Sequence, residues 1–379
     1  MSNNNRIQVA VVGMGFGAEF VPIYLDHPQV KKVWICDADE AKLNRIRERF
    51  RLANRCTDLG AILDNPEIDA VHLVTPIPLH AQQAVAVLKA GKHCACTVPM
   101  ATNLDDLKAV VAAQERSGKN YTMMETAVYT REFLYVKERS EHGDFGRIQF
   151  LRGAHYQDME NWPDYWLGLP PMHYATHAIS PLLALAGTRA ESVHCFGSGL
   201  MRPELHAQYG NPFPIETAIF RLEGTNVAAE VTRTLFHTAR GYTESFSLYG
   251  EAMSFEWQQN EEEDPMLFTM APLQPGRGRS ITVERVHVPD YAHLLPPEIA
   301  KHTRQFVYDD QETHLSFLQG GGHGGSHPHL VHEFVSSIVE GRAPRIDAVT
   351  AADWTAAGIC AHESAMRGGD EVVIPRFGE

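Results

Sequence analysis

Two histidines and a tyrosine are the residues of this chain best suited to move protons. In His173-Tyr174-Ala175-Thr176-His177 the histidines stand four residues apart, the spacing that places two side chains on one helix face. Imidazole titrates near neutral pH and serves both directions of proton transfer. We therefore take His177, His173 and Tyr174 as candidate catalytic residues. Metal ligation and a histidine packed in the core are alternatives. Carboxylates at a matching spacing are missing, so no metal is expected.

A glycine-rich segment near the N-terminus predicts a dinucleotide-binding loop. Gly13-Met14-Gly15-Phe16-Gly17-Ala18 follows the apolar run 7–12, which is typical of a buried parallel strand. The first glycine permits a tight turn, the second lets a pyrophosphate approach the backbone, and Ala18 allows close helix–strand packing. Asp37, after the second strand, can bind the ribose hydroxyls and would repel a 2′-phosphate. NAD is therefore expected rather than NADP, the alternative being a plain turn with a surface aspartate.

Aromatic and hydrogen-bonding side chains are interleaved over residues 152–171, and a second basic and aromatic cluster follows at 233–242. Aromatic rings can cover the apolar faces of a sugar while polar groups bond its hydroxyls. The run Gly321-Gly322-His323-Gly324-Gly325 would allow close backbone approach to a ligand. Tryptophans packed in a core and a merely flexible loop are the alternatives. The candidate substrate-binding residues are Arg152, His155, Gln157, Asp158, Trp162, Trp166, Arg233, Arg240, His323 and His327.

The elements that must position these residues divide near residue 125. Before it, apolar runs alternate with helical patterns, which predicts βαβ units and a parallel sheet. Beyond it, longer alternating stretches predict an antiparallel sheet with one covered face, interrupted by helices around 171–185 and 329–340. We expect an α/β protein with an NAD-binding Rossmann domain over 1–125. A substrate-binding and oligomerisation α/β domain over 126–379 would carry a large, mostly antiparallel open sheet.

Composition narrows the classes of partner. The 379 residues suffice for two domains, and 44% hydrophobic with 21% charged residues is typical of a soluble globular protein. The net charge of −14 argues against nucleic acid and anionic membranes as partners. The N-terminal MSNNNRIQ has no apolar stretch, so no secretory signal or membrane helix is expected. Six cysteines without a CxxC pair suit reduced thiols in a cytoplasmic protein.

The chain resembles the glucose–fructose oxidoreductase/inositol dehydrogenase (Gfo/Idh/MocA) family along nearly its whole length. Thr97-Val98-Pro99 stands where that family carries Glu-Lys-Pro, and valine has no proton to exchange. Three features resemble the branch of NAD-dependent glycosidases typified by an α-N-acetylgalactosaminidase: the Tyr-x-Thr-His spacing at 174–177, the Val-Pro pair at 98–99 and the Gly-Gly-His-Gly-Gly run at 321–325. Thr97 and Ala175 depart from that branch, so its substrate is not carried over.

The resemblance also implies further cofactor residues and an assembly. In the family, a Thr-Pro segment followed by a histidine, here Thr75-Pro76 and His80, lines the nicotinamide half of the pocket. Thr97 would hydrogen-bond the nicotinamide ribose, whereas Val98 can only pack. The family often pairs its open sheets, which implies a homodimer or homotetramer. The predicted cofactor residues are Gly13, Gly15, Phe16, Gly17, Ala18, Asp37, Thr75, Pro76, His80, Thr97 and Pro99.

The activity implied by the resemblance is that of an NAD-dependent glycoside hydrolase acting on a small carbohydrate or glycoside. It would work by transient oxidation at sugar carbon 3, elimination, water addition and re-reduction, with the cofactor carrying the hydride step. His177, His173 and Tyr174 would be the acids and bases, with their individual roles open. Sulfoquinovosides are cleaved in this way by one bacterial group, and the arginines and histidines would suit a sulfonate. The alternatives are an NAD-dependent sugar or polyol dehydrogenase with His177 as base, and a non-catalytic NAD(H) sensor.

Overall fold

The computed structural model describes residues 6–304, 306–307, 318–319 and 322–378. These residues form two compact units. The first unit takes the residues up to Thr130, the stretch Asp290–Ala352 and the C-terminal residues from Phe377 onward. The second unit takes Arg131–Pro289 and Asp353–Arg376. The chain therefore returns to the first unit after residue 290, an arrangement that local sequence patterns do not reveal.

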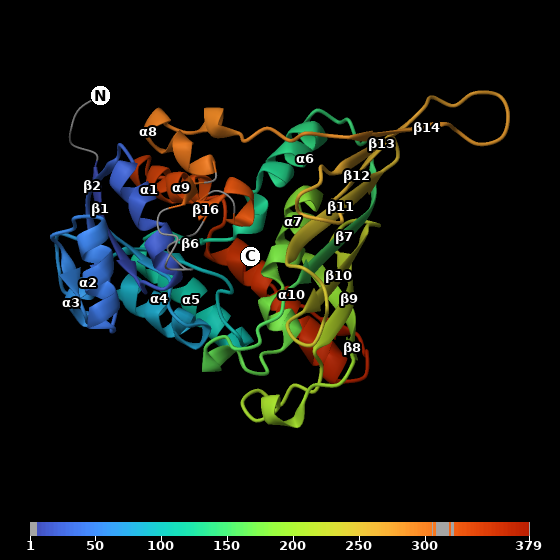
Figure 1. Ribbon diagram of the computed structural model, residues 1–379. Helices are drawn as coiled ribbons and strands as arrows, with labels where there is room; N and C mark the ends of the chain where they lie inside the picture. The colour runs from blue at the N-terminus through green and yellow to red at the C-terminus, as the bar shows by residue number, and fades with distance from the viewer. Residues whose placement is uncertain (1–5, 305, 308–317, 320–321, 379) are drawn as a thin grey trace. The chain divides into compact units, whose positions relative to one another are not determined.

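The first unit is built on a six-stranded parallel sheet in the order β3-β2-β1-β4-β5-β6 (Figure 1). Every residue of its central strand β1 (Ile7–Val12) is buried, as expected for a parallel strand covered on both faces. The other strands are β2 (Val30–Cys36), β3 (Arg55–Cys56), β4 (Ala70–Leu73), β5 (His93–Cys96) and β6 (Tyr121–Met123), with a separate small pair β15 (Phe306–Val307) and β16 (Leu318–Gln319). The helices are α1 (Val21–Asp26), α2 (Glu40–Arg49), α3 (Leu59–Leu63), α4 (His80–Lys89), α5 (Leu104–Ser117), α8 (Pro297–Ala300) and α9 (His327–Val339).

The second unit is built on a nine-stranded sheet in the order β14-β13-β12-β11-β7-β10-β9-β8-β17. All neighbouring strands are antiparallel except β7 and β10, which confirms the predicted mostly antiparallel sheet and the α/β class. The strands are β7 (Ile148–Tyr156), β8 (Ala190–Ser198), β9 (Ile215–Leu222), β10 (Ala228–Thr234), β11 (Thr243–Gly250), β12 (Met253–Glu256), β13 (Met266–Met270), β14 (Ile281–Arg285) and β17 (Val372–Val373). The helices are α6 (Arg131–Glu141) and α7 (Thr176–Ala186), and α10 (Ala348–Met366) contributes residues to both units.

One face of this second sheet is apolar and covered. Leu151, Leu248, Phe255 and Leu267 are register partners across β7, β11, β12 and β13, and all four are fully buried. Side chains alternate between the two faces of a strand, so the neighbours of these residues point to the other face. Helix α7 lies close to β7, because a Cβ atom at Gly153 would come within 2.2 Å of the Ala178 carbonyl oxygen. Residues of α7 are thereby brought next to the covered face.

One sequence prediction is corrected here. The helix expected around 171–185 is two elements, because a 3₁₀ turn over Pro171–Tyr174 ends before α7 begins at Thr176. The prolines at 170 and 171 favour such a turn but cannot donate the backbone hydrogen bonds of a helix interior. Strands β13 and β14 form a hairpin that protrudes from the sheet (Figure 1), and the proline- and glycine-rich residues 272–278 lie in the loop between them.

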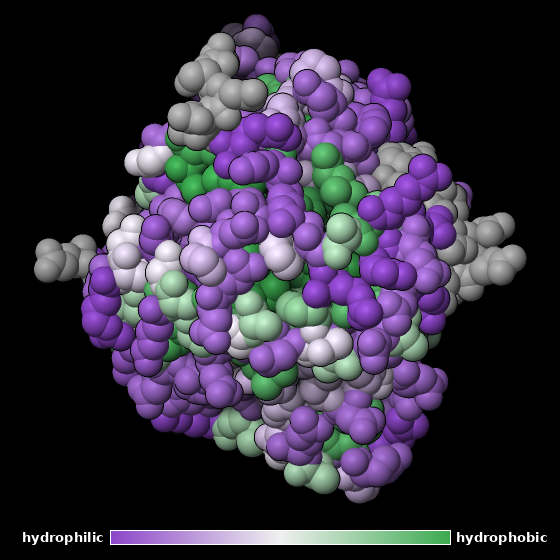
Figure 2. Space-filling model, turned by 90° about the vertical axis from the view of Figure 1, so that its left-hand side faces the viewer, coloured by the Kyte–Doolittle hydropathy of each residue, from purple (hydrophilic) through white to green (hydrophobic). Residues whose placement is uncertain are grey.

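The surface is largely polar where it can be seen. The face drawn in Figure 2 is mostly hydrophilic, with apolar residues in small scattered groups, as is normal for a folded chain in water. Among the described helices, none combines the length and the apolar character needed to cross a membrane.

Candidate active site

The glycine-rich loop after β1 has the backbone that a dinucleotide site needs. Gly13 has φ +93°, and a Cβ atom there would lie 2.2 Å from the Val74 carbonyl oxygen, so a side chain is excluded. Its N–H donates to the Cys36 carbonyl oxygen over 2.8 Å, which fixes the turn against β2. By contrast, a Cβ atom at Gly15 would have no atom within 4 Å, so the loop is open at this residue. A tight turn followed by an open glycine fits the approach of a pyrophosphate.

Gly17, rather than Ala18, is the residue that allows the loop to pack closely on the sheet. A Cβ atom at Gly17 would lie 3.2 Å from the side chains of both Val11 and Val74. Ala18 is also buried, but the close-packing role predicted for it belongs to its neighbour. The first helical turn after the loop, Phe16–Glu19, is 3₁₀, and α1 begins only at Val21.

Both carboxylate oxygens of Asp37 are held by backbone N–H groups. Oδ2 accepts a hydrogen bond from the Met14 N–H over 2.6 Å, and Oδ1 accepts one from the Asp39 N–H over 2.8 Å. Each carboxylate oxygen has a second lone pair, so the anchored group can still accept from ribose hydroxyls. Lys42, which sequence reasoning did not single out, places its Nζ 3.9 Å from Oδ2. The turn, the open glycine and the oriented carboxylate together fit NAD.

His80 joins the segments that follow β4 and β5. Its Nδ1 lies 2.8 Å from the Pro99 carbonyl oxygen and its Nε2 lies 2.8 Å from the Thr75 carbonyl oxygen. Burial lowers the pKa of this histidine. Thr97 Oγ1 is 3.4 Å from the same Nε2, and Val98 is buried. Of the predicted nicotinamide residues, the structure therefore brings Thr75, His80, Thr97 and Pro99 together, with His80 holding the two segments in place and Pro76 between Thr75 and the next turn.

His323 and His327, expected at the substrate, lie in the first unit beside the aromatic residues of the cofactor loop. The ring centroid of Phe16 is 5.9 Å from that of His323 and 5.6 Å from that of His327. His327 Nδ1 lies 3.4 Å from Glu19 Oε2, and both side chains are buried. Burial lowers the pKa of His327 and raises that of Glu19. A contact with substrate stays a prediction for both histidines.

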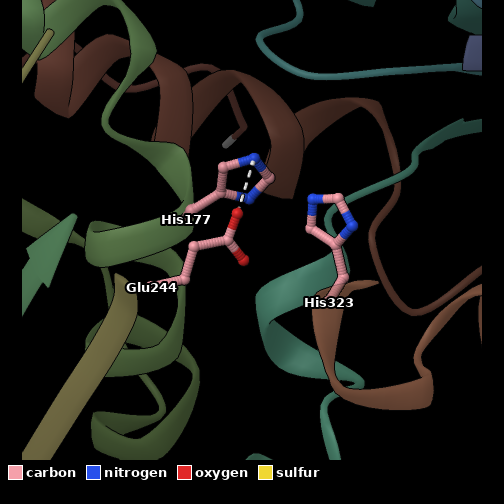
Figure 3. A group of neighbouring side chains, drawn as sticks. All are labelled: His177, Glu244 and His323. Carbon is pink, nitrogen blue, oxygen red and sulfur yellow. Dashed lines mark ion pairs between the residues drawn. The ribbon is translucent and has the colours of Figure 1, made fainter. Parts of the chain in front are cut away.

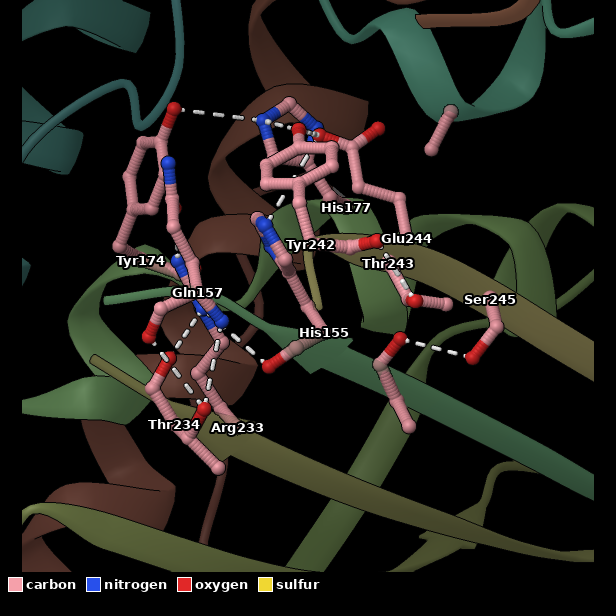
Figure 4. A network of polar contacts seen from close by, with 12 residues as sticks. His155, Gln157, Tyr174, His177, Arg233, Thr234, Tyr242, Thr243, Glu244 and Ser245 are labelled. Carbon is pink, nitrogen blue, oxygen red and sulfur yellow. Dashed lines mark hydrogen bonds and ion pairs between the residues drawn. The ribbon is translucent and has the colours of Figure 1, made fainter. Parts of the chain in front are cut away.

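In the second unit, His177 lies between a phenol and a carboxylate (Figure 4). Its Nε2 is 3.3 Å from Tyr174 Oη and 3.7 Å from Glu244 Oε1. The same carboxylate oxygen accepts a hydrogen bond from Tyr242 and lies 3.9 Å from His155 Nε2. His323, also drawn in Figure 3, belongs to the first unit. We call His155, Tyr174, His177, Tyr242 and Glu244 the acid–base cluster, since each of them can exchange a proton.

The fold explains why these distant residues meet. Glu244 and His155 are register partners in the antiparallel pair β11 and β7, so both side chains point to the covered face. Arg233 on β10 is the register partner of His155 on the other side of β7. His177 is the second residue of α7, the helix packed on β7 at Gly153. Three strands and one helix start therefore converge on one small region.

Arg233 donates hydrogen bonds that hold residues of the acid–base cluster in place. It is fully buried, its Nε donates to the Tyr174 carbonyl oxygen over 2.8 Å, and its Nη2 donates to Gln157 Oε1 over 2.9 Å. Its Nη1 donates to the carbonyl oxygens of His155 and Thr234, and the guanidinium carbon lies 5.3 Å from the centre of the Tyr174 ring (Figure 4). Four of its five N–H groups thus donate hydrogen bonds to protein acceptors. Burial lowers the pKa of Arg233 to about 10. These partners make Arg233 and Gln157 positioning residues for Tyr174.

Comparison with known proteins identifies the first unit. Residues 7–125 match the Gfo/Idh/MocA family model, described as an oxidoreductase family with an NAD-binding Rossmann fold. This unit carries the NAD-binding domain of the Gfo/Idh/MocA family. The match confirms the predicted family domain and the predicted NAD cofactor, and the enzymes among the relatives are consistent with an NAD-dependent enzyme.

Similarity to relatives extends along the whole chain. A "Glycosyl hydrolase family 109 protein" of Saccharopolyspora erythraea is 22% identical, covering 99% of this chain and 84% of that protein. A 1-carboxy-3-chloro-3,4-dihydroxycyclohexa-1,5-diene dehydrogenase of Comamonas testosteroni is 29% identical. That match covers 40% of this chain and 38% of the dehydrogenase. A levoglucosan dehydrogenase solved with NADH and levoglucosan has a TM-score of 0.78 at 22% identity, covering 98% of this chain and all of that one. The levoglucosan dehydrogenase therefore shares the fold of this chain.

His173 is not part of the acid–base cluster. The 3₁₀ turn that carries it ends at Tyr174, and Ala175, with φ −107° and ψ 6°, separates the turn from α7. The prediction that His173 and His177 share one helix face is therefore wrong. The His173 ring centroid lies 4.9 Å from that of His362, and burial, with His362 nearby, lowers its pKa to about 3. A catalytic role for His173 has no support from this placement.

Several predicted substrate residues are not members of the acid–base cluster. Arg152 points to the opposite face of β7 from His155, where its Nε is 3.2 Å from Glu230 Oε1. Trp166 is buried, with its ring centroid 4.8 Å from that of Tyr174, which matches the alternative of a packed tryptophan. The exposed members of the set are Arg152, Asp158 and Trp162, while Arg240 is half-buried and donates to the Gln259 carbonyl oxygen over 2.7 Å.

Glu244 is the functional candidate that the sequence prediction missed. On β11 it alternates with Phe246 and Leu248, which are buried on the covered face. A carboxylate at an inward position of an amphipathic strand is rare unless it is paired or functional. The position of Glu244 in this alternating pattern could therefore have marked it as a candidate from the sequence.

Proposed function

We propose that the protein is an NAD-dependent glycoside hydrolase that acts by transient oxidation at sugar carbon 3, elimination, water addition and re-reduction. The observation that carries the proposal is the placement of His177 between Tyr174 Oη and the Glu244 carboxylate. Val98, at the position where dehydrogenases of the family carry lysine, is buried and has no proton to exchange. Relatives named glycosyl hydrolase family 109 cover 98–99% of the chain and support the same activity.

The chain has to supply groups for three proton transfers. Protons move at the carbon 3 hydroxyl, at carbon 2, which becomes acidic beside a ketone, and at the leaving oxygen on carbon 1. When bound, NAD supplies the hydride acceptor and donor for carbon 3. The imidazole of His177 can serve in both directions, and the Tyr174 phenol can donate to a leaving oxygen. Glu244, 3.7 Å from the imidazole, stabilises its protonated form.

The protein also orients these groups. Arg233 holds the backbone of Tyr174, while Trp166 packs edge-on against the Tyr174 ring. Tyr242 donates to Glu244 and thereby fixes the carboxylate that faces His177. A group held in this way exchanges its proton from a fixed position, which is where most of the benefit of general acid–base catalysis arises.

The substrate class is a small glycoside. A sulfonated sugar has less support than the sequence suggested, because Arg233 is engaged by protein acceptors and Arg152 lies on the opposite face. We also propose that the enzyme is a cytoplasmic homodimer or homotetramer. The open face of the second sheet supports this, since Phe196 and Ile219 are 61% and 44% exposed on neighbouring strands β8 and β9.

A net NAD-dependent sugar or polyol dehydrogenase is the second candidate. It is favoured by the likeness of fold to a levoglucosan dehydrogenase and to a scyllo-inositol dehydrogenase of Lactobacillus casei, the latter with a TM-score of 0.72 at 17% identity. His177 would then act as the only base for the substrate hydroxyl. The acid–base cluster argues against a sensor without catalysis, because a sensor needs no such arrangement.

The test follows the hydrogen at carbon 2 and the redox state of the cofactor. The protein is incubated in D₂O with a panel of aryl glycosides and polyols, the released sugar is examined by NMR, and reduced nicotinamide is followed by absorbance. We expect glycoside cleavage with deuterium at carbon 2 and no net NADH. Accumulation of NADH in step with product, without cleavage, would replace the hydrolase by the dehydrogenase. If neither cleavage nor NADH is seen with any compound of the panel, the non-catalytic NAD(H) sensor becomes the favoured function.

A further inference from the structure

Two cysteines of the first unit are paired across neighbouring strands. Cys36 ends β2, Cys56 ends β3, and the two are register partners in the parallel sheet. Register partners point to the same face, and neighbouring strands lie about 4.8 Å apart, within the roughly 4.4–6.8 Å separation of Cα atoms in disulfides. Each thiol shifts the pKa of the other, so the two side chains interact. All six cysteines are free, so this pair is reduced.

The two sulfurs differ in reactivity. Cys56 is partly exposed, and its hydrogen bonds with Cys36 and with the Asp58 backbone lower its pKa to about 7, although burial and the Asp58 charge act in the opposite direction. The same thiol–thiol hydrogen bond, together with burial and the charges of Asp37 and Asp58, raises the pKa of Cys36. A thiolate is the reactive form of cysteine, so Cys56 is the nucleophile at neutral pH and Cys36 the partner thiol.

The other cysteines lack this character. Burial raises the pKa of each of their thiols, and all four are buried. They are Cys94, Cys96, Cys195 and Cys360. Reactivity toward oxidants is therefore confined to one pair among the six cysteines.

The pair is joined to the cofactor loop through the backbone. The Cys36 carbonyl oxygen accepts a hydrogen bond from the Gly13 N–H over 2.8 Å. The next residue, Asp37, accepts from the Met14 N–H over 2.6 Å and is the predicted ribose ligand. A displacement of the end of β2 would therefore reach both the tight turn and the ribose carboxylate.

We propose that Cys36 and Cys56 form a reversible disulfide under peroxide and that this disulfide weakens NAD binding. The Cys56 thiolate attacks one peroxide oxygen, and Cys56 becomes a sulfenic acid as the O–O bond breaks. The other oxygen leaves as hydroxide and takes up a proton to form water. The Cys36 sulfur then attacks the sulfenic sulfur, which expels its oxygen as a second water. Overall, two thiols and one hydrogen peroxide give one disulfide and two waters. The covalent link fixes both cysteine side chains in disulfide geometry, and the change at Cys36 reaches Gly13 and Asp37 through their backbone hydrogen bonds.

The test measures NAD affinity by titration calorimetry, without turnover, so it is independent of the proposed activity. The protein is treated with hydrogen peroxide, excess oxidant is removed with catalase, and peptide mapping locates any disulfide. We expect a Cys36–Cys56 link and about tenfold or greater weakening of NAD binding, within the usual range of coupling between sites. Dithiothreitol should restore the affinity, whereas it does not reverse methionine oxidation.

Variants of partly exposed Cys56 and buried Cys360 give the controls. Cys56→Ser should bind NAD like the untreated protein before and after peroxide, and Cys360→Ala should remain sensitive. The proposal is overturned if the disulfide forms without any change in NAD affinity. It is also overturned if the mapped peptides stay reduced after treatment, or if Cys56→Ser loses affinity as the parent does.

Discussion

Glu244 Oε1 lies 3.7 Å from His177 Nε2, although the two residues are far apart in the chain and come from a strand and a helix start. The carboxylate is on the covered face of its sheet, where it meets Tyr242 and His155 as well. A buried carboxylate beside an imidazole stabilises positive charge on the ring. The pair is therefore the part of the cluster whose removal is most informative.

Replacing Glu244 by glutamine should lower turnover while preserving shape. The amide is isosteric but carries no charge, so the protonated form of His177 loses its partner. We expect a fall in kcat of about 10²–10⁴, the scale of a lost acid–base contribution. Glu230→Gln is the matched control, because Glu230 faces the opposite side of the same sheet. Equal activity of the two variants on a cleaved glycoside would remove Glu244 from the mechanism.

His177→Ala and His173→Ala form a second matched pair. His177 contacts Tyr174 and Glu244, whereas His173 lies against His362. The first change should reduce turnover by about 10²–10⁴ with NAD binding retained. The second should leave kcat close to that of the parent. Steady-state kinetics on both variants decides the matter, and the reverse order of effects would restore His173 as the catalytic histidine.

The cofactor loop was predictable because its signals are local. Gly13 is needed for a positive φ and Asp37 directly follows the adjacent strand, so both follow from a short segment of sequence. The role of Ala18 was misplaced by one residue, since Gly17 and Ala18 are both small and only the packing against Val11 and Val74 separates them. Lys42 could not be placed near Asp37 without the start of α2.

The acid–base cluster was only half predictable, because half of it is brought together by pairing of distant strands. Tyr174 and His177 are close in sequence and were found by their spacing. Glu244 depends on the register of β11 against β7, which no local pattern fixes. The error at His173 has a local cause, since a four-residue spacing places side chains on one face only if the helix is continuous.

Asp37→Ala should weaken NAD binding by about 1–3 kcal/mol, the range for losing a hydrogen bond to a charged group. The loss would have two sources, the ribose hydroxyls and the loosened Met14 amide. Asp39→Ala is a useful control, because Asp39 caps α2 by accepting from the Ala41 and Lys42 amides. That variant should lose about 1 kcal/mol of stability with NAD affinity near that of the parent. Unchanged calorimetric affinity in Asp37→Ala would show that another group binds the ribose.

The last prediction concerns acid and rests on His72, a fully buried histidine of the first sheet. Burial lowers its pKa from 6.5 to about 3, so the folded state keeps it neutral. Below pH 6.5 the unfolded chain takes up a proton that the folded chain refuses. The contribution of neutral His72 to the free energy of unfolding is therefore fully present above pH 6.5. It is lost as the pH falls toward 3, at about 1.4 kcal/mol per pH unit.

His72→Gln should make the unfolding temperature less sensitive to acid between pH 6.5 and 4.5. Glutamine does not titrate, and its amide can still accept a hydrogen bond from Tyr24, whose Oη lies 3.2 Å from His72 Nδ1. The variant will be less stable at pH 7, because the ring packs against Phe20 with centroids 4.6 Å apart, so the slope with pH is the quantity to compare. Thermal unfolding of both proteins at several pH values provides it. Equal slopes of unfolding temperature against pH in the two proteins would mean that His72 is protonated in the folded protein. The claim that folded His72 stays neutral would then be wrong.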